Sequence, residues 1–166
     1  MIRIGLISDT HGFLDEKVFF HLNNCNEIWH AGDIGDIKVF DTLCKFKPIK
    51  AVYGNIDGPD ISRQLPEDLS FNCEGINVLI THIGGYPHRY NQRVKSMLTK
   101  DVPDLFICGH SHILRIMTDP KLNDMLYMNP GAAGKHGLHK IKTLIRFNIN
   151  DGKIRNVEVI ELGSRA

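Results

Sequence analysis

The segment "IGLISDTHG", residues 4–12, decides the fold of this 166-residue chain. The apolar run that contains it, Ile2 to Ser8, predicts a buried strand, because a short apolar run bounded by turn signals is typical of a parallel sheet. Asp9 and His11 follow directly and lie two residues apart. On extended backbone two such side chains can point the same way, so they offer a carboxylate oxygen and an imidazole nitrogen to one ion.

The same arrangement, a polar cluster shortly after an apolar run, recurs along the chain. The runs that predict strands are Glu27 to His30, Ile49 to Tyr53, Val78 to Thr81 and Leu105 to Cys108. The clusters after them are Gly32-Asp33, Gly54-Asn55, His82, Gly109-His110 and His112. Because parallel strands end at the same edge of a sheet, and ligands bind in the crevice beyond that edge, we expect these side chains to converge.

The converging set holds two carboxylates, one carboxamide and four imidazoles, all of which divalent first-row metals accept as ligands. Seven donors exceed the needs of one four-coordinate ion and favour two ions that share a bridging carboxylate. Asp33 suits the bridge, because Gly32 lets the backbone approach a ligand closely. The predicted partition places Asp9, His11, Asp33 and His112 on one ion, and Asp33, Asn55, His82 and His110 on the other. Two divalent ions, two carboxylates and a bridging hydroxide leave a net charge of about +1 to attract phosphate.

The remaining pattern predicts one α/β domain over residues 1–166. Helices are expected at Phe13 to Asn23, Asp36 to Phe46 and Tyr90 to Lys100, where apolar residues recur at helical spacing. In the first half they alternate with strands, a β-α-β-α-β order that implies parallel pairing. The stretch from Leu65 to Gly75 is either a loop or an edge strand.

The last third of the chain changes character. Met125 to Met128 is a short apolar strand, and Thr143 to Ile149 alternates between apolar and polar residues. Asn150-Asp151-Gly152 is a strong hairpin signal that leads into a strand from Lys153 to Leu162. These late antiparallel strands predict a second sheet packed against the first.

Composition limits the classes of partner. The hydrophobic fraction of 42% and the charged fraction of 23% are typical of a soluble globular protein. The formal net charge of +1 provides no basic field for nucleic acid or an anionic membrane, and no apolar stretch has the length of a membrane span. Four cysteines stand far apart, without a C-x-x-C pair, and a strand that begins at Ile2 leaves no room for a signal peptide. We therefore expect a cytoplasmic protein with reduced thiols.

The ordered series D-x-H, G-D, G-N, H and G-H-x-H resembles the calcineurin-like metallophosphoesterase superfamily. The motifs "IGLISDTHG", "WHAGDI", "VYGNIDG", "CGHSH" and "NPGA", spread over Ile2 to Gly134, resemble its small single-domain bacterial and archaeal phosphodiesterases. The resemblance implies the metallophosphoesterase fold, an α/β (α+β) four-layer α-β-β-α sandwich with two mixed β-sheets. It also implies two divalent metal ions, manganese foremost or else nickel, iron or zinc, held by the seven residues above.

The reaction that the resemblance implies is hydrolysis of a small phosphate ester, a phosphodiester in the first place, by in-line attack of a metal-bridging hydroxide. Asp33, Asn55 and His82 are then the candidate catalytic residues. Many relatives read G-N-H-[DE], where the histidine contacts substrate and can protonate the leaving group, but this chain has Ile56 there. Where relatives often read "THGH", it has Ile83-Gly84-Gly85 after His82. Without an acid, good leaving groups such as aryl phosphodiesters are expected to react best.

Four further residues are candidates for supporting the site or contacting substrate, and each has a plainer alternative. His30 either orients Asp33 or a ligand, or packs at the end of a strand. Asp57 is either a substrate-side acid or part of a turn. Asn129 either supports the site or forms a turn, and His136, like other loop histidines, either contacts substrate or lies free in its loop.

Two other functions fit parts of this pattern. The retromer scaffold subunit of eukaryotes shares the expected fold but has a degraded site, so the alternative is a protein-interaction platform with vestigial catalysis. The complete set of seven donors argues against that alternative, and turnover separates the two. A nuclease like the larger DNA-repair members would need an added DNA-binding region, for which the length and charge leave no room.

Overall fold

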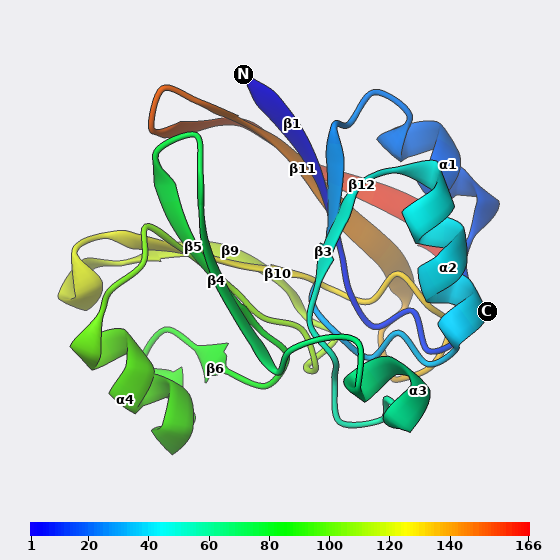
Figure 1. Cartoon of the computed structure of the whole chain (residues 1–166), viewed down its shortest axis with the longest axis horizontal. Helices are drawn as coiled ribbons and strands as arrows, with labels where there is room; N and C mark the ends of the chain where they lie inside the picture. Colours follow the sequence, from blue (N-terminus) through cyan, green and yellow to red (C-terminus); the bar gives the residue numbers. More distant parts are fainter.

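The computed structural model describes residues 1–166 and contains two five-stranded β-sheets flanked by helices (Figure 1). The strands are β1 (Ile2–Ile7), β2 (Glu27–His30), β3 (Ile49–Ala51), β4 (Asp68–Cys73), β5 (Ile76–Thr81), β6 (Gly85–Tyr86), β7 (Arg89–Tyr90), β8 (Leu105–Ile107), β9 (Leu114–Asp119), β10 (Met125–Pro130), β11 (Ile141–Asn150) and β12 (Lys153–Ser164). The helices are α1 (Glu16–Leu22), α2 (Ile37–Phe46), α3 (Pro59–Ser62), α4 (Gln92–Lys100) and the 3₁₀ helix η1 (Pro120–Leu122). No helix is long and apolar enough to cross a membrane.

The first sheet has the strand order β12-β11-β1-β2-β3. Strands β1, β2 and β3 pair in parallel, as their alternation with helices predicts. The C-terminal hairpin of β11 and β12 joins this same sheet, because β11 pairs antiparallel with β1 and places Phe147 opposite Ile4. The expected second sheet exists and contains β10, but the prediction that the C-terminal hairpin belongs to it is wrong. A strand's own pattern specifies which of its faces is buried, but not which distant strand it pairs with.

The second sheet has the order β4-β5-β8-β10-β9. Its three central strands, β5, β8 and β10, are parallel, and the two edge strands are antiparallel to their neighbours. Strand β4 lies within the stretch that was expected to be a loop or an edge strand. Strand β9 has no counterpart among the predicted elements. Both sheets are therefore mixed, as expected.

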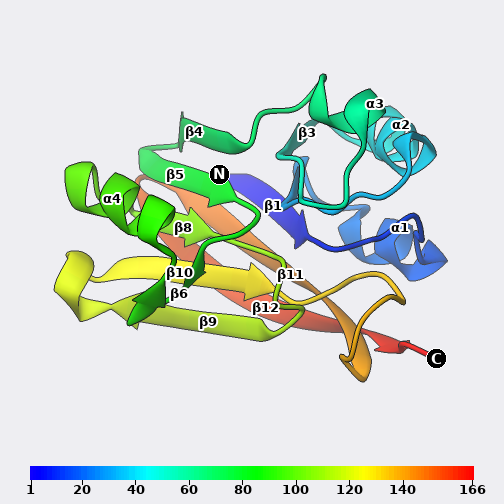
Figure 2. The ribbon, with the colours of Figure 1, turned by 90° about the horizontal axis from the view of Figure 1, so that it is seen from below.

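Three hydrophobic clusters separate four layers. The largest, which includes Trp29 and Phe147, fills the space between the two sheets. A second cluster, with Leu43 among its members, joins the first sheet to α1 and α2. A third joins the second sheet to α4 through Phe106 and Leu98. Figure 2 shows α1 and α2 beyond one sheet and α4 beyond the other, which is the α-β-β-α sandwich that was expected.

Helices α1 and α2 each begin at an aspartate cap. The side chain of Asp15 accepts a hydrogen bond from the Lys17 amide, and that of Asp36 does the same for Lys38. Such a cap satisfies one of the free amide groups of a first helical turn. Helix α1 consequently begins at Glu16, later than the expected Phe13, and residues 8–15 form the loop that follows β1.

Candidate metal centre

The seven predicted ligands lie in the loops that follow the carboxyl ends of the parallel strands. The first sheet contributes Asp9 and His11 after β1, Asp33 after β2 and Asn55 after β3, and the second contributes His82 after β5 and His110 and His112 after β8. Sequence reasoning assumed one sheet edge. The structure instead joins the edges of two packed sheets.

Asp9, His11 and His112 form one group whose ligand atoms all lie within 4.8 Å of one another. Nε2 of His112 lies 3.2 Å from Oδ1 of Asp9, and Nε2 of His11 lies 3.8 Å from the same oxygen. These three residues belong together in the predicted partition as well.

Asp33, His82 and His110 form the second such group. Nε2 of His82 lies 3.1 Å from Oδ2 of Asp33, and the rings of His82 and His110 meet edge to face with their centroids 5.3 Å apart. Asn55 adjoins this group, because its Oδ1 accepts a hydrogen bond of 3.0 Å from Nδ1 of His110.

Asp33 connects the two groups. Its Oδ2 lies 3.3 Å from Nε2 of His11 in the first group and 3.1 Å from Nε2 of His82 in the second. Its Oδ1 accepts a hydrogen bond of 3.1 Å from the amide of Ile56. One oxygen is therefore held by the backbone while the other faces imidazoles of both groups.

Three buried atoms in this cluster have no hydrogen-bond partner: Oδ1 of Asp9, Nε2 of His11 and Nε2 of His82. Both nitrogens lie 3.8 Å from that oxygen. An unsatisfied buried polar atom costs on the order of 1–3 kcal/mol, so three of them facing one another need a ligand that accepts oxygen and nitrogen together. Divalent first-row cations have that preference, and the residues present therefore fit the metal ions that the family resemblance implies.

Five of the seven residues have backbone in the left-handed region, with φ of 54° at Asp9, 46° at His11, 55° at Asp33, 68° at His110 and 59° at His112. The pairs spaced two apart therefore converge through left-handed turns, and the extended backbone that sequence reasoning assumed for them is wrong. Such a conformation costs about 1–3 kcal/mol at a residue other than glycine and is concentrated at functional sites.

Two glycines allow the ligands to approach one another. A Cβ atom on Gly54 would collide with the carboxylate of Asp33, and one on Gly32 would lie 2.7 Å from Nδ1 of His82. Gly32 also has a φ of 96°, which side chains rarely tolerate. Gly32, before Asp33, thus makes room for His82, and Gly54, before Asn55, makes room for Asp33.

The electrostatics of the cluster favour positive charge. Burial would raise the pKa of Asp9 and Asp33, but the imidazoles that face the two carboxylates outweigh it and hold both pKa values well below the usual range. The carboxylate of Asp33, and then that of Asp9, raises the pKa of His11 to about 9. The pKa of His110 is lowered instead, because burial is its largest influence. The two carboxylates thus attract cationic charge to the centre.

Two hydrogen bonds orient ligands toward the centre. Nδ1 of His82 donates to the carbonyl of Ala31 at 2.7 Å, which leaves Nε2 free to face Asp33. Oδ2 of Asp9 accepts from the hydroxyl of Ser8 at 2.6 Å, so that Oδ1 faces the histidines. Sequence reasoning treated Ser8 only as the end of a strand, and its place beside Asp9 was the one available signal.

His30 ties the loop after β1 to the loop after β2. It is fully buried, its Nδ1 accepts a hydrogen bond from the Gly32 amide at 3.1 Å, and its Nε2 lies 3.1 Å from the hydroxyl of Thr10. That hydroxyl donates to the carbonyl of Ile34 at 3.0 Å. His30 therefore supports the two ligand-bearing loops through their neighbours rather than by orienting Asp33 directly.

A pH dependence follows from this burial, which lowers the pKa of His30 to about 4. An unfolded histidine has a pKa of about 6.5. Between pH 4 and pH 6.5 this histidine is therefore protonated in the unfolded chain and neutral in the folded chain. The free energy of unfolding therefore has its full value above pH 6.5 as far as His30 is concerned. It falls by about 3 kcal/mol as the pH falls to 4, because protonation then favours the unfolded chain. Urea unfolding of the chelator-treated wild type and of His30→Gln should show their stability difference shrinking by that amount. A difference independent of pH would contradict the assignment.

Asp57 acts on the backbone. Its carboxylate accepts hydrogen bonds from the amides of Ile34 at 3.2 Å, Gly35 at 2.8 Å and Gly54 at 2.8 Å. Both oxygens are engaged by these amides. The geometry supports the alternative in which Asp57 stabilises a turn, and not a substrate-side acid.

Asn129 holds the loop that carries His110 and His112. Its Nδ2 donates to the carbonyl of Gly109 at 2.9 Å and to the hydroxyl of Ser111 at 3.1 Å, and its side chain is buried. The supporting role considered for Asn129 is therefore consistent with the structure.

Two loop histidines pack on the ligands. His136 stacks on the ring of His11, with centroids 4.8 Å apart and planes 21° apart. His139 meets His112 edge to face at 5.2 Å, and its Nε2 donates to the carbonyl of Gly134 at 2.8 Å. Both therefore lie close enough to the centre to influence substrate binding or ligand orientation.

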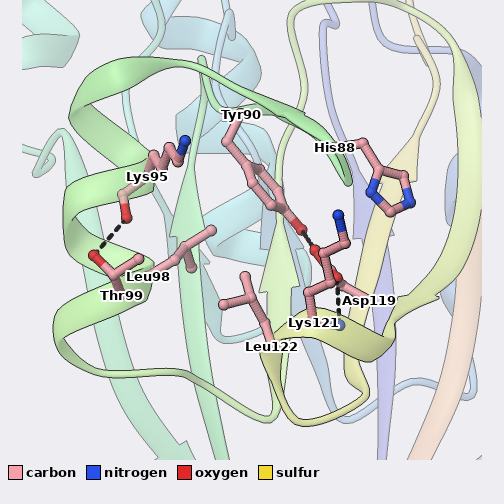
Figure 3. Close-up of a pocket in the computed structure, with 8 residues that line it drawn as sticks. All are labelled: His88, Tyr90, Lys95, Leu98, Thr99, Asp119, Lys121 and Leu122. Atoms are coloured by element: carbon pink, nitrogen blue, oxygen red, sulfur yellow. Dashed lines mark hydrogen bonds between the residues drawn. The ribbon is translucent and has the colours of Figure 1, made fainter.

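A separate cavity of about 260 Å³ lies between α4 and the segment of β9 and η1 (Figure 3). In it the hydroxyl of Tyr90 donates to Oδ2 of Asp119 at 2.7 Å, and His88 and Lys95 line its walls. It contains none of the seven predicted ligands. We therefore place the candidate site at the carboxyl ends of the strands and not in this cavity.

Comparison with known proteins gave consistent results. A family model described as a calcineurin-like phosphoesterase superfamily domain matches residues 2–152. A probable metallophosphoesterase of Methanothermobacter thermautotrophicus is 29% identical over 166 residues, covering 97% of this chain and 93% of the relative. The structure of a novel archaeal phosphodiesterase aligns with a TM-score of 0.75 and 24% identity, over 96% of this chain and 100% of that chain. Vps29 from Entamoeba histolytica, in a mutant form, aligns with a TM-score of 0.74 and 18% identity over 96% and 99%. At these identities the two structures show the fold alone.

Proposed function

The chain belongs to the calcineurin-like phosphoesterase superfamily, and from this premise we propose that it is a binuclear metal-dependent phosphodiesterase. One observation carries the proposal: two groups of ligands share Asp33, and three buried donor atoms among them have no partner within the protein. A single structural ion would need only one of these groups.

The proposed ligands follow the two groups. Asp9, His11, Asp33 and His112 would hold one ion, and Asp33, Asn55, His82 and His110 would hold the other. When bound, the two ions would supply the Lewis acidity that activates water and stabilises negative charge on a phosphoryl group. The ligand set contains only two carboxylates, and Asn55 is neutral, so the centre retains the positive charge that a phosphodiester anion requires.

Three residues are the proposed catalytic groups. Asp33 faces both halves of the centre through Oδ2, and His82 is fixed by its bond to Ala31, so both are preorganised before substrate binds. Asn55 is exposed beside His110, where its amide can contact a phosphoryl oxygen. Ile56 follows it and has no proton to donate, so a leaving group would depart without help from this position.

Replacing His112 by alanine tests the division into two sites. The side chain is 14% exposed at the crevice, so we expect the metal-free fold to keep its melting temperature. Bound metal should fall from two ions to one. We expect kcat to fall at least about 100-fold, because the loss of a residue that only supports a metal ligand can already lower activity by up to about that factor. Equal losses of thermal stability and activity in His112→Ala would mark a structural residue instead.

His136→Ala should raise KM with a milder effect on kcat.

The alternative function is a protein-interaction platform with vestigial catalysis. The fold similarity to Vps29 is compatible with it, but similarity at this level does not extend to function. A panel of phosphomonoesters, phosphodiesters and cyclic nucleotides, assayed with Mn²⁺, Ni²⁺, Fe²⁺ and Zn²⁺, separates the two functions. Hydrolysis of diesters ahead of monoesters supports our proposal, and bound metal without any hydrolysis supports the platform.

We place manganese first among the candidate metals, although mixed nitrogen and oxygen ligands accept nickel, iron and zinc as well. The four cysteines are free, which is compatible with a reducing cytoplasm. The balanced net charge of +1 favours a small phosphate ester as the substrate over nucleic acid.

A further inference from the structure

Two cavities adjoin the proposed metal centre and have no lining residue in common. The first, of about 360 Å³, includes Asn55 and His82 in its wall. The second, of about 440 Å³, includes His110 and His112. A phosphodiester has two ester arms, one that leaves and one that is retained, so a site that binds it needs space on two sides of the phosphorus.

The two cavities differ in chemistry. The first is lined by Glu67, Thr81 and Arg93, and the guanidinium of Arg93 donates to the hydroxyl of Thr81 at 2.9 Å. The second is lined by Ile113 and Leu138 beside the ligands. The first wall, which also includes Ile83, therefore carries two opposite charges. The second combines two aliphatic side chains with imidazoles and Ser111, and contains no carboxylate or guanidinium.

The aliphatic side chains of the second cavity are left uncovered by the rest of the chain. Leu138 is 97% exposed and Ile113 is 55% exposed. Ile113 directly follows His112, and Leu138 lies between Gly137 and His139. Large apolar side chains that cluster at a pocket are typical of a ligand-binding surface, because their contact with water is unfavourable until a ligand covers them.

The loop that carries Leu138 is held against the metal centre. Gly137 has a φ of 124°, and a Cβ atom there would collide with the ring of His112. On the other side of Leu138, His139 packs edge to face on His112. Leu138 is therefore positioned beside a proposed metal ligand by close contacts on both sides.

We propose that this second cavity binds an apolar ester arm of the phosphodiester, and that Ile113 and Leu138 determine the preference for it. The inference rests on the proposed function, since the phosphoryl group must lie at the metal centre for the arm to reach the cavity. The preferred substrates are then phosphodiesters with one alkyl or aryl arm, ahead of diesters whose arms are both small or polar.

A series of esters with a constant leaving group tests this preference. The substrates are methyl, butyl and hexyl p-nitrophenyl phosphate, hydrolysed by the metal-loaded protein. We expect kcat/KM to rise about tenfold from methyl to hexyl, mainly through KM, because each buried methylene adds to the binding. The double variant Ile113→Ser, Leu138→Ser should lose this rise from methyl to hexyl. Phe20→Ser is the matched control, because Phe20 is 79% exposed on α1 and lines neither cavity.

The outcomes distinguish this inference from the proposed function. Equal kcat/KM for the three esters in the wild type would overturn the inference and leave the phosphodiesterase activity standing. If no ester is hydrolysed, the proposed function fails, and calorimetric binding of hexylphosphonate and methylphosphonate to the metal-loaded protein decides the inference. About tenfold tighter binding of hexylphosphonate, lost in the double variant, supports it, and equal affinities overturn it.

Discussion

Replacing Asp33 by asparagine is expected to lower kcat/KM for a phosphodiester on the order of 10³-fold or more, because stabilisation by metal ions is worth several kcal/mol. Oδ2 of Asp33 lies 3.3 Å from Nε2 of His11 and 3.1 Å from Nε2 of His82, so the charge is withdrawn from both groups of ligands at once. Asparagine keeps the shape of the side chain and offers one neutral oxygen. Metal analysis and kinetics on the same preparation measure the two effects together.

Asp119→Asn is the matched control. Asp119 is 2% exposed, as Asp33 is, but it lies in the separate cavity of Figure 3. There its carboxylate accepts a hydrogen bond from the hydroxyl of Tyr90. We expect Asp119→Asn to retain both metal ions and the wild-type rate, even if its stability falls. An Asp33→Asn variant that binds two ions and has a rate within about tenfold of the wild type would contradict the proposal that Asp33 is shared by both metal ions.

The sequence was sufficient to predict that the side chains of the proposed ligands converge, because its signals are local. Each proposed ligand follows a parallel strand that can be recognised from its own apolar run, and parallel strands place their carboxyl ends together. Asp9 and His82 come from different sheets, yet β1 and β5 run in the same direction (Figure 2). The two residues therefore meet, although the prediction assumed a single sheet edge. The two groups of ligands therefore agree with the predicted partition.

Other features depend on contacts that no local pattern encodes. The pairing of β11 with β1 joins residues more than a hundred positions apart, and nothing in Thr143 to Ile149 specifies that partner. The left-handed backbone at Asp9 and His110 is stabilised by surrounding structure, including the bond from the His110 amide to Oδ2 of Asp9. The exposure of Leu138 beside His112 also becomes evident only when the loop is folded.

Rates of hydrolysis are expected to fall steeply as the pKa of the leaving group rises. Ile56 is 45% exposed beside Asn55, at the position where a proton donor would stand, and it cannot donate. Both oxygens of Asp57 are held by backbone amides, so this neighbour does not replace the acid. General acid catalysis is typically worth about 10²–10⁴-fold, and an alkoxide leaving group would forgo that gain. Aryl phosphodiesters should therefore react far faster than alkyl phosphodiesters of similar size.

The measurement is a plot of log kcat/KM against leaving-group pKa for the wild type, with the retained arm kept constant. Ile56→His is the companion variant, and a selective gain for alkyl leaving groups in it would support a missing acid at this position. A flat plot under conditions where chemistry limits the rate would mean that another residue donates the proton. His136, stacked on His11, would then be the first residue to replace.

Metal titration of the chelator-stripped protein tests the central claim most directly, with bis(p-nitrophenyl) phosphate as the substrate and Mn²⁺ added in steps. We predict no hydrolysis without metal and a rate that rises until two ions are bound per chain, since both groups of ligands are then filled. Full activity at one ion per chain would contradict the binuclear centre. Two bound ions without hydrolysis of this or any other phosphate ester, with Mn²⁺, Ni²⁺, Fe²⁺ or Zn²⁺, would contradict the enzyme itself.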